Sequence, residues 1–368
     1  MPDNTITMLI GTKKLSGWKS VSVERSLDAL ADVFSMEFVD IWANSDSPLV
    51  PYEPLKVSIF KTSGGKQITE QVVAGYIDTI DMEIIVDQIM VRVSGRSFTG
   101  DLVDCSAEFG KSNSWNNTPL TTIIRDLLDL YDIGLDFISS SAYGKDSNLS
   151  LTINSGESIF EIIDRECRKR GIIAVTNPYG NLELITTGDR VSQDKLVVGE
   201  NILSANMTID YTNRFGVYTV KGQKTGNGSS WNSSTTKING SATDPVFQGR
   251  YRNKIISMDG TGTNQDAQNV ASWESQVRAG KSGQLVIKIP SWFQSDGTLW
   301  EVGTLVYCNV NPLNVNEQLL INNIKFTQGN DGTFTTLTLV NKDTYSQDPS
   351  KTNKITKKSK KKGFGYGW

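Results

Sequence analysis

Acid–base chemistry in this chain would have to use carboxylates, lysine or tyrosine, because the sequence contains no histidine. The carboxylates nearest one another form two groups, Asp101 with Asp104, and Glu161 with Asp164 and Glu166. A glycosidase needs two carboxyl groups placed across a cleft. The second group shares an expected helix with Arg165 and Arg168, which favours solvated ion pairs. Neither group therefore predicts an active site.

Other kinds of reactive site are also poorly supported. The absence of histidine removes Ser-His and Cys-His pairs and every zinc site that contains histidine. Cys105, Cys167 and Cys308 lie far apart, which indicates buried thiols in a reducing compartment. The glycines of the segment 95–100 lack dinucleotide spacing and a following Lys-Ser/Thr, so a turn explains them better than a phosphate site. We expect no catalytic residue, metal or cofactor.

The charge of the chain is unevenly distributed. Residues 349–368 contain seven lysines and no acid, so residues 1–348 hold 30 Lys and Arg against 40 Asp and Glu, a net charge of −10. An acidic body argues against a nucleic-acid enzyme with a basic surface. The first residues do not resemble a signal peptide, and no apolar run reaches the ~20 residues of a membrane helix. We therefore expect a soluble protein that is made in a cytoplasm and does not insert into a membrane.

The lysine-rich tail, residues 349–368, permits three interpretations. It is a solvated, disordered end, a docking arm for an acidic partner, or a DNA contact in which lysines meet phosphates and aromatic rings meet bases. The acidic body favours protein docking over DNA. The candidate docking residues are Lys357, Lys358, Lys360, Lys361, Lys362, Phe364, Tyr366 and Trp368.

The period of the apolar residues divides the chain into regions. Residues 6–95 alternate apolar with polar residues between turn signals, which predicts a small β-barrel or sandwich. A compact α+β module follows, with one helix starting at Asn117-Thr118-Pro119 and another running from near Ser155 to Gly171. The predicted domains are 1–95, a first β-barrel; 96–195, the α+β module; 196–348, a second β-barrel; and 349–368, a flexible tail.

Two further elements are expected in the second β region. Residues 224–245 are rich in Gly, Ser, Asn and Thr, which predicts a long surface loop. Residues 264–279 predict a helix that Gly280 ends. The fold class is thus mainly β with an α+β insert, in which two similar small barrels flank the module.

Residues 52–93 and 300–339 carry one β pattern twice. In each, a Glu-Gln pair precedes an isoleucine by six residues, at Gln71 and Ile77 and again at Gln318 and Ile324. A chain with one barrel-like unit at each end presents two similar faces per copy. Three such chains would form a trimeric ring or cup of six units.

Several segments resemble the Mu-like phage baseplate hub proteins, relatives of the late control protein D group of contractile tails. The most specific is the run from Gly95-Arg96-Ser97 to Asp104-Cys105-Ser106. The other segments that carry the resemblance are 75–80, 91–94, 156–171, 323–326 and 332–339. The tail and the expected loop at 224–245 lie outside it.

The resemblance implies a homotrimer in which the two barrels of each chain alternate around a ring. Such a hub would adapt the six-fold tail tube to the three-fold membrane-piercing spike. It implies no active site. The implied partners are other copies of the chain, the spike protein, the tail tube or tube-initiator protein, and the tape-measure protein or genome DNA in the lumen. The protein would belong to the virion tail baseplate and be assembled in the bacterial host cytoplasm.

Two other functions stay open at this point. One is a carbohydrate-active, tail-associated hydrolase that uses Asp101, Asp104 or Glu108. The other is a DNA-contacting assembly factor that works through the lysine-rich tail.

Overall fold

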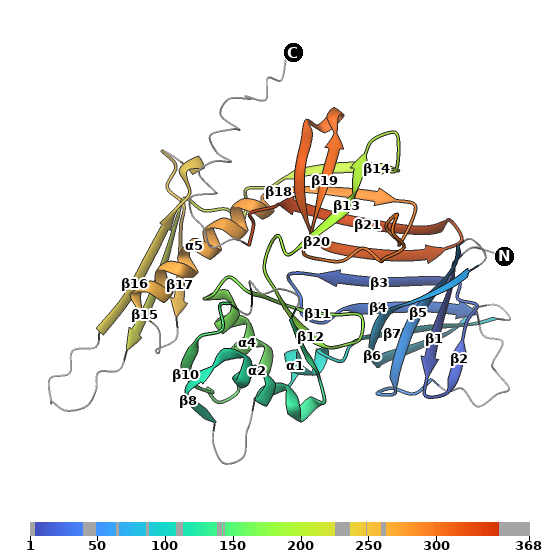
Figure 1. The fold of residues 1–368 in the computed structure, drawn as a ribbon, viewed down its shortest axis with the longest axis horizontal. Helices are drawn as coiled ribbons and strands as arrows, with labels where there is room; N and C mark the ends of the chain where they lie inside the picture. Colours follow the sequence, from blue (N-terminus) through green and yellow to red (C-terminus); the bar gives the residue numbers. More distant parts are fainter. Residues whose placement is uncertain are drawn as a thin grey trace.

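The computed structural model describes residues 4–345 apart from 40–48, 64–65, 86–87, 108–112, 138–141, 143, 225–235, 248 and 259–262. These residues are mainly β with a few helices, which confirms the predicted mainly β class. Figure 1 shows one large sheet, a small α+β module beneath it and a separate smaller sheet at one side. Glu108 and the whole tail 349–368 lie outside the described residues.

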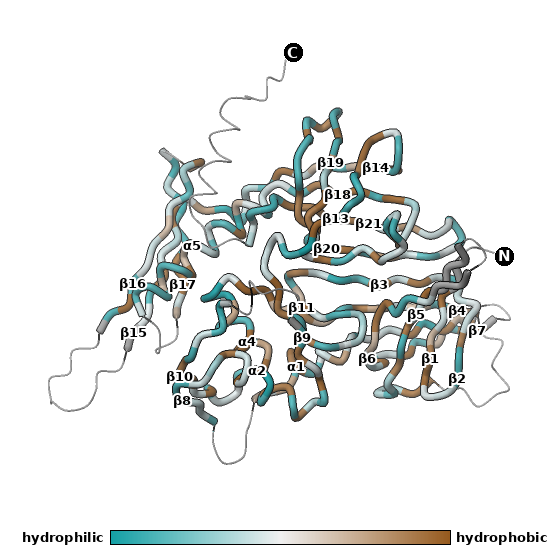
Figure 2. The backbone as a smooth tube through the Cα atoms, in the orientation of Figure 1, coloured by the Kyte–Doolittle hydropathy of each residue, from teal (hydrophilic) through white to brown (hydrophobic). Residues whose placement is uncertain are grey.

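The large sheet takes its strands from both ends of the chain. From the N-terminal side come β1 (Asn4–Ile10), β2 (Lys13–Leu15), β3 (Ser20–Ser26), β4 (Val33–Val39), β5 (Pro54–Ser63), β6 (Lys66–Ile85) and β7 (Gln88–Ser97). From the C-terminal side come β13 (Arg190–Val197), β14 (Ser204–Ile209), β18 (Gly283–Ile289), β19 (Thr304–Val310), β20 (Val315–Gly329) and β21 (Gly332–Asn341). Hydrophobic residues alternate with hydrophilic ones along many of these strands (Figure 2), as expected for strands with one buried face.

Strands β3 and β20 join the two sides into a single sheet. They pair antiparallel from Ser26 opposite Asn323 to Val21 opposite Gln328. One continuous hydrophobic core includes Val23 and Phe34 from the N-terminal side and Phe326 and Leu337 from the C-terminal side. The two predicted barrels are therefore not separate sheets. The predicted boundaries at residues 95 and 195 stay predictions.

The α+β module has its own core, which includes Ile124, Leu127, Ile159 and Ile163. Its elements are α1 (Gly100–Asp104), β8 (Ser114–Pro119), α2 (Leu120–Leu128), η1 (Asp129–Tyr131), β9 (Leu135–Phe137), β10 (Asn148–Thr152), α4 (Ile159–Arg168), β11 (Ile173–Thr176) and β12 (Leu182–Ile185). The predicted start of the first helix is wrong in detail. Pro119 is the N-cap of α2 without a side-chain hydrogen bond, and the Asp146 carboxylate accepts from the Thr121 N–H at 3.0 Å instead.

A separate sheet includes part of the segment 224–245, which the sequence predicts as a loop. It consists of β15 (Val217–Lys224), β16 (Thr236–Thr243) and β17 (Asn253–Met258). Since β16 pairs along its whole length with β15, that prediction is wrong for residues 236–243, and 225–235 lie outside the described residues. Helix α5 (Asn264–Lys281) covers one face, so closely that a Cβ on Gly240 would lie 2.3 Å from the α5 backbone.

Helix α5 does not stop at Gly280 as predicted. It continues to Lys281 and is capped at Ser282. A Cβ on Gly280 would lie 2.1 Å from the Thr344 hydroxyl. The glycine therefore allows a close approach of the chain after β21, rather than ending the helix. Short 3-10 turns at η2 (Pro245–Phe247) and η3 (Asn311–Leu313) complete the described elements.

Candidate functional site

The two halves of the large sheet repeat one strand order. In the N-terminal half it is β3–β4–β7–β6–β5–β1, and in the C-terminal half it is β14–β18–β21–β20–β19–β13. All matching pairs are antiparallel except the last, since β1 pairs antiparallel with β5 whereas β13 pairs parallel with β19. The predicted duplication is thus present as a repeated strand topology.

The bulges of the two middle strands fix the equivalent residues. The register of β6 against β7 shifts at Asp78, and that of β20 against β21 shifts at Asn322. Position 322 against 78 is an offset of 244 residues, whereas the sequence pattern, with Gln71 matched to Gln318, has an offset of 247. The sequence match therefore finds the right strands but is three residues out of register.

Each bulge residue is held by its own polar cluster. In the N-terminal half, Arg96 Nε donates to Asp78 at 2.8 Å, and its two Nη atoms donate to Asp104 at 3.1 and 2.7 Å. In the C-terminal half, Asn322 Nδ2 donates to Asp28 at 3.1 Å, and Tyr345 donates to the same carboxylate at 2.7 Å.

Of the first candidate carboxylate group, Asp104 is thus part of a structural ion-pair cluster. Asp101 and Asp104 both lie on α1, directly after β7. The hydrogen bonds from Arg96 lower the pKa of Asp104, and burial raises the pKa of Asp101. A carboxylate held by a bidentate arginine suits ion pairing better than proton transfer.

The second candidate group has three different roles on α4. Glu161 forms a capping box with Ser158, so the predicted ion pairing is wrong for Glu161. Asp164 pairs with Arg168 at 2.8 Å, as predicted. Glu166 is buried and contacts Lys169 at 2.6 Å and Arg170 at 3.2 Å. Burial raises the pKa of Glu166, but these cations outweigh burial and the pKa is lowered.

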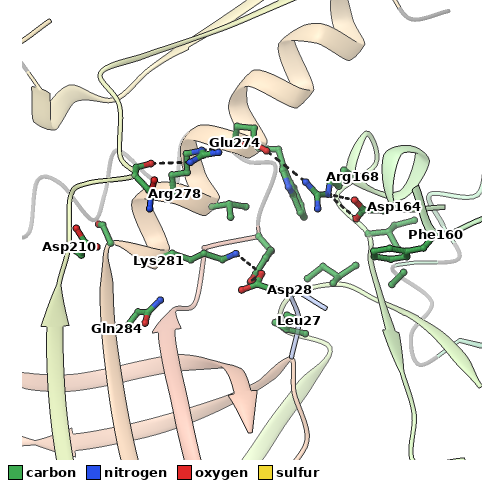
Figure 3. A pocket seen from close by; sticks show the side chains of 18 of the residues that line it. Leu27, Asp28, Phe160, Asp164, Arg168, Asp210, Glu274, Arg278, Lys281 and Gln284 are labelled. Atoms are coloured by element: carbon green, nitrogen blue, oxygen red, sulfur yellow. Dashed lines mark hydrogen bonds and ion pairs between the residues drawn. The ribbon is translucent and has the colours of Figure 1, made fainter. Parts of the chain in front are cut away.

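A cleft of about 470 Å³ lies where α4, α5 and the turn after β3 meet (Figure 3). Arg168 contacts Asp164 on α4 and Glu274 on α5, at 2.8 and 3.8 Å. Arg278 pairs with Glu274 at 2.9 Å. Lys281 pairs with Asp28. These charged side chains pair with one another, so the cleft is a junction at which α4, α5 and the turn after β3 contact each other.

The Asp28 carboxylate anchors this junction. Burial raises its pKa, but Lys281 and the hydrogen bonds from Tyr345 and Asn322 outweigh burial, so the pKa lies below its usual range. Burial and the neighbouring Asp28 raise the pKa of the Tyr345 hydroxyl. These residues are up to 317 positions apart, so no local sequence pattern could identify the cluster.

A buried ion pair lies beside the β3–β20 contact. Arg25 Nε is 3.1 Å from Asp32 Oδ2, and both side chains are 3% exposed. Arg25 also donates to the carbonyl of Val72. Burial raises the pKa of Asp32 to about 7, against the opposing attraction of Arg25. A buried pair of this kind is expensive to break from one side only.

The three cysteines are free. Cys167 and Cys308 are buried as predicted, whereas the prediction is wrong for Cys105, which is only partly buried. Burial, with a smaller contribution from Glu317, raises the pKa of Cys308 to about 12. Burial likewise raises the pKa of Cys167. A raised pKa keeps a thiol protonated and unreactive.

Metal-binding groups and membrane-spanning helices are both absent from the described part of the chain. It holds no group of three His, Cys, Asp or Glu side chains placed to bind a metal ion. It also has no helix with the length and apolar character needed to cross a membrane. The predicted docking residues from Lys357 to Trp368 lie outside it.

Three family models match this chain in sequence order. The N-terminal model of the Mu phage baseplate assembly protein GpP-like family matches residues 5–97, and the second-domain model of the baseplate hub protein gp44-like family matches residues 99–186. The fourth-domain model of the Mu phage baseplate assembly protein GpP matches residues 263–348.

Full-length relatives agree with these models. The baseplate hub protein gp44 of Escherichia phage Mu is 33% identical over 308 residues, which are 82% of this chain and 78% of the relative. The 43 kDa tail protein of prophage MuSo2 from Shewanella oneidensis has a TM-score of 0.76 and 26% identity over 93% of this chain and 99% of that one. A Neisseria meningitidis tail protein has the same fold, with a TM-score of 0.74 and 18% identity over 94% and 99% of the two chains. The chain belongs to the Mu-like family of baseplate hub proteins and is a structural protein of a phage tail baseplate.

Proposed function

We propose that this hub protein works as a homotrimeric ring that adapts a six-fold tail tube to a three-fold membrane-piercing spike. The observation that carries the proposal is the repeated strand order of the two halves of the large sheet. Three copies present six such halves. One face of the ring then offers near-equivalent contacts to six tube subunits. The parts of the chain that occur in only one of the two halves are present three times in the ring, and they give the spike a three-fold surface.

The partners follow from that role. They are other copies of the chain, the spike protein, the tail tube or tube-initiator protein, and the tape-measure protein or genome DNA that passes through the lumen. The hub would be assembled in the bacterial host cytoplasm. The tail residues Lys357, Lys358, Lys360, Lys361, Lys362, Phe364, Tyr366 and Trp368 are proposed to dock on an acidic partner surface.

The hub acts through contacts rather than catalysis in this proposal. The pairing of Asp104 with Arg96 argues against a hydrolase at Asp101 and Asp104. Purified protein should therefore leave peptidoglycan uncleaved, measured as release of soluble fragments. Cleavage that Asp101→Asn abolishes would instead establish the hydrolase.

Light scattering at micromolar concentration tests the ring directly. The expected mass is three times that of the chain. A separate end-on image of the ring should show six-fold features on one face. A stable monomer, or a closed dimer, overturns the proposal. Removing residues 349–368 should leave the protein trimeric, with a mass three times that of the shortened chain, because the proposed tail contacts are with other proteins.

A further inference from the structure

Part of one edge of β6 has no strand partner among the described residues. Strand β5 pairs with residues 66–76 of β6, and β7 pairs with residues 75–85 from the other side. Residues 79–84 therefore have a neighbouring strand on one side only. In this stretch Met82 is 65% exposed and Ile84 is 80% exposed. An exposed apolar edge strand readily pairs with another chain.

The equivalent edge of β20 is covered within the same chain. Aligning the bulges makes Met82 equivalent to Phe326 and Ile80 equivalent to Ile324. Strand β3 pairs with this edge, with Val23 opposite Phe326. Phe326, Ile324 and Val23 are completely buried. Apolar residues thus occupy β6 at positions whose equivalents in β20 are buried by a paired strand.

The strand equivalent to β3 in the other half is β14. Val23 of β3 pairs with Phe34 of β4, and Met207 of β14 pairs with Leu285 of β18. Strand β4 then pairs with β7, with Phe34 opposite Gly95, and β18 pairs with β21 in the same register, with Leu285 opposite Leu339. Within the described residues β14 pairs with β18 alone, so its outer edge is open.

A groove of about 260 Å³ lies beside β14. Its lining includes Met207, Ile209, which is 55% exposed, and Tyr211, which is 43% exposed. Its wall includes Gln276, which is only 5% exposed, and neither polar atom of this amide has a hydrogen-bond partner in the described structure. A buried amide without partners is costly. A strand that enters the groove from outside would supply both apolar side chains and polar backbone groups.

We propose that β14 of one copy pairs with the open edge of β6 in a neighbouring copy, antiparallel and in the register that β3 uses on β20. This inference rests on the proposed ring and identifies its contact surface. In that register Met82 lies opposite Met207 of the neighbouring copy. Ile80 lies opposite Ile209 of that copy, and Ile84 opposite its Ala205. The contact is a strand addition with head-to-tail symmetry, which forms a closed ring when the rotation between copies closes.

Engineered cysteines test the register in the full-length chain. Met82→Cys and Met207→Cys are introduced together, with Cys105→Ser because Cys105 is the half-exposed native thiol. Mild oxidation should link copies into a covalent species of three chains, seen by non-reducing electrophoresis and mass spectrometry. The matched control pairs Met82→Cys with Ile255→Cys, a residue on β17 that is 55% exposed. Little cross-linking is expected from that control.

The outcomes separate this inference from the ring itself. Equal cross-linking in the test and control pairs overturns the β6–β14 contact, and so does a test bond found only within one chain. If light scattering of the unmodified protein still gives a trimer, the ring remains and a different surface forms it. If the protein is a monomer in solution, the proposed function fails whatever the cysteines show.

A charged residue at the same edge gives a second test. Met82→Asp should raise the concentration at which the ring assembles by about 100-fold, because pairing would bury an unpaired charge. The folded protomer should keep its circular dichroism spectrum, since Met82 is exposed in the single chain. Ile255→Asp is the control and should assemble like the native protein. Assembly of Met82→Asp at the native concentration overturns the inference.

Discussion

The two halves of the large sheet share a strand order but differ in how their middle strands are covered. In the C-terminal half, β3 pairs with residues 323–328 of β20, and Phe326 is buried. In the N-terminal half, the equivalent part of β6 leaves Met82 exposed. The same topology therefore serves as a closed core in one half and as an open surface in the other. A repeated unit can form its internal contact once and keep the equivalent surface for another molecule.

Packing within the halves also differs at equivalent positions. Gly75 and Gly95 in the N-terminal half correspond to Leu319 and Leu339 in the C-terminal half. A Cβ on Gly95 would lie 2.0 Å from the Tyr76 carbonyl oxygen and 2.6 Å from the Phe34 ring. The N-terminal half thus packs strands closely around glycine, whereas the C-terminal half fills the same positions with leucine. Similar strand orders do not require similar side chains.

The largest difference between the halves is expected at Phe326 and Met82. Phe326→Ala should lower the free energy of unfolding by about 3–5 kcal/mol, because it leaves a cavity in the core. Met82→Ala should change it by less than about 0.5 kcal/mol in dilute protein. Urea unfolding below the assembly concentration measures both. A comparable loss in the two variants would mean that Met82 is already buried within one chain.

A smaller effect is expected at the close-packed glycine. Gly95→Ala should cost about 1–3 kcal/mol, since the new methyl group overlaps the Tyr76 backbone and the Phe34 ring. Gly283→Ala in β18 is the matched control, because a Cβ there meets no atom within 4 Å. Its effect should stay below about 0.5 kcal/mol. Equal unfolding midpoints for the two variants would contradict the difference in packing between the halves.

The smallest effect is expected at the cluster around the β20 bulge. Asp28→Asn should cost up to about 1 kcal/mol at pH 7, because the Asp28 side chain is 39% exposed and solvent weakens its ion pair. Since the pKa of Asp28 is lower in the folded chain, its contribution is present above about pH 4 and is lost as the pH falls through the folded pKa. The stability gap between native protein and variant should therefore narrow from pH 7 to pH 3. A constant gap would exclude ionisation of Asp28 as its source.

Local patterns in the sequence predicted two helices of the α+β module, although α4 begins at Ile159 and not near Ser155 as predicted. Ile159, Ile162, Ile163 and Cys167 are all buried along α4, as their helical spacing indicates. Gly171 follows the helix with a φ of +62°, a conformation that glycine adopts without strain. Strands β11 and β12 pair antiparallel across a short turn that contains Pro178 and Gly180. These elements depend on spacing and turn residues that are close in sequence.

Other features could not be predicted from local patterns. The bulges at Asp78 and Asn322 fix the alignment of the two halves, but neither has a sequence signal. The match of Gln71 with Gln318 is therefore three residues out of register. Strand β16 was missed because its outward residues are polar and glycine takes the place of one inward side chain. The cleft cluster and the β3–β20 contact unite residues some 300 positions apart, which only the tertiary fold determines.

The pairing of β3 with β20 also has a consequence for how the chain is made. Strand β3 ends at Ser26, and its partner begins at Val315. During synthesis on the ribosome, β3 therefore cannot pair with β20 until most of the polypeptide has emerged. Contacts so distant in sequence slow folding. The nascent chain would keep the edge of β3 open throughout synthesis, an interval in which a chaperone that shields strand edges would raise the yield of native protein.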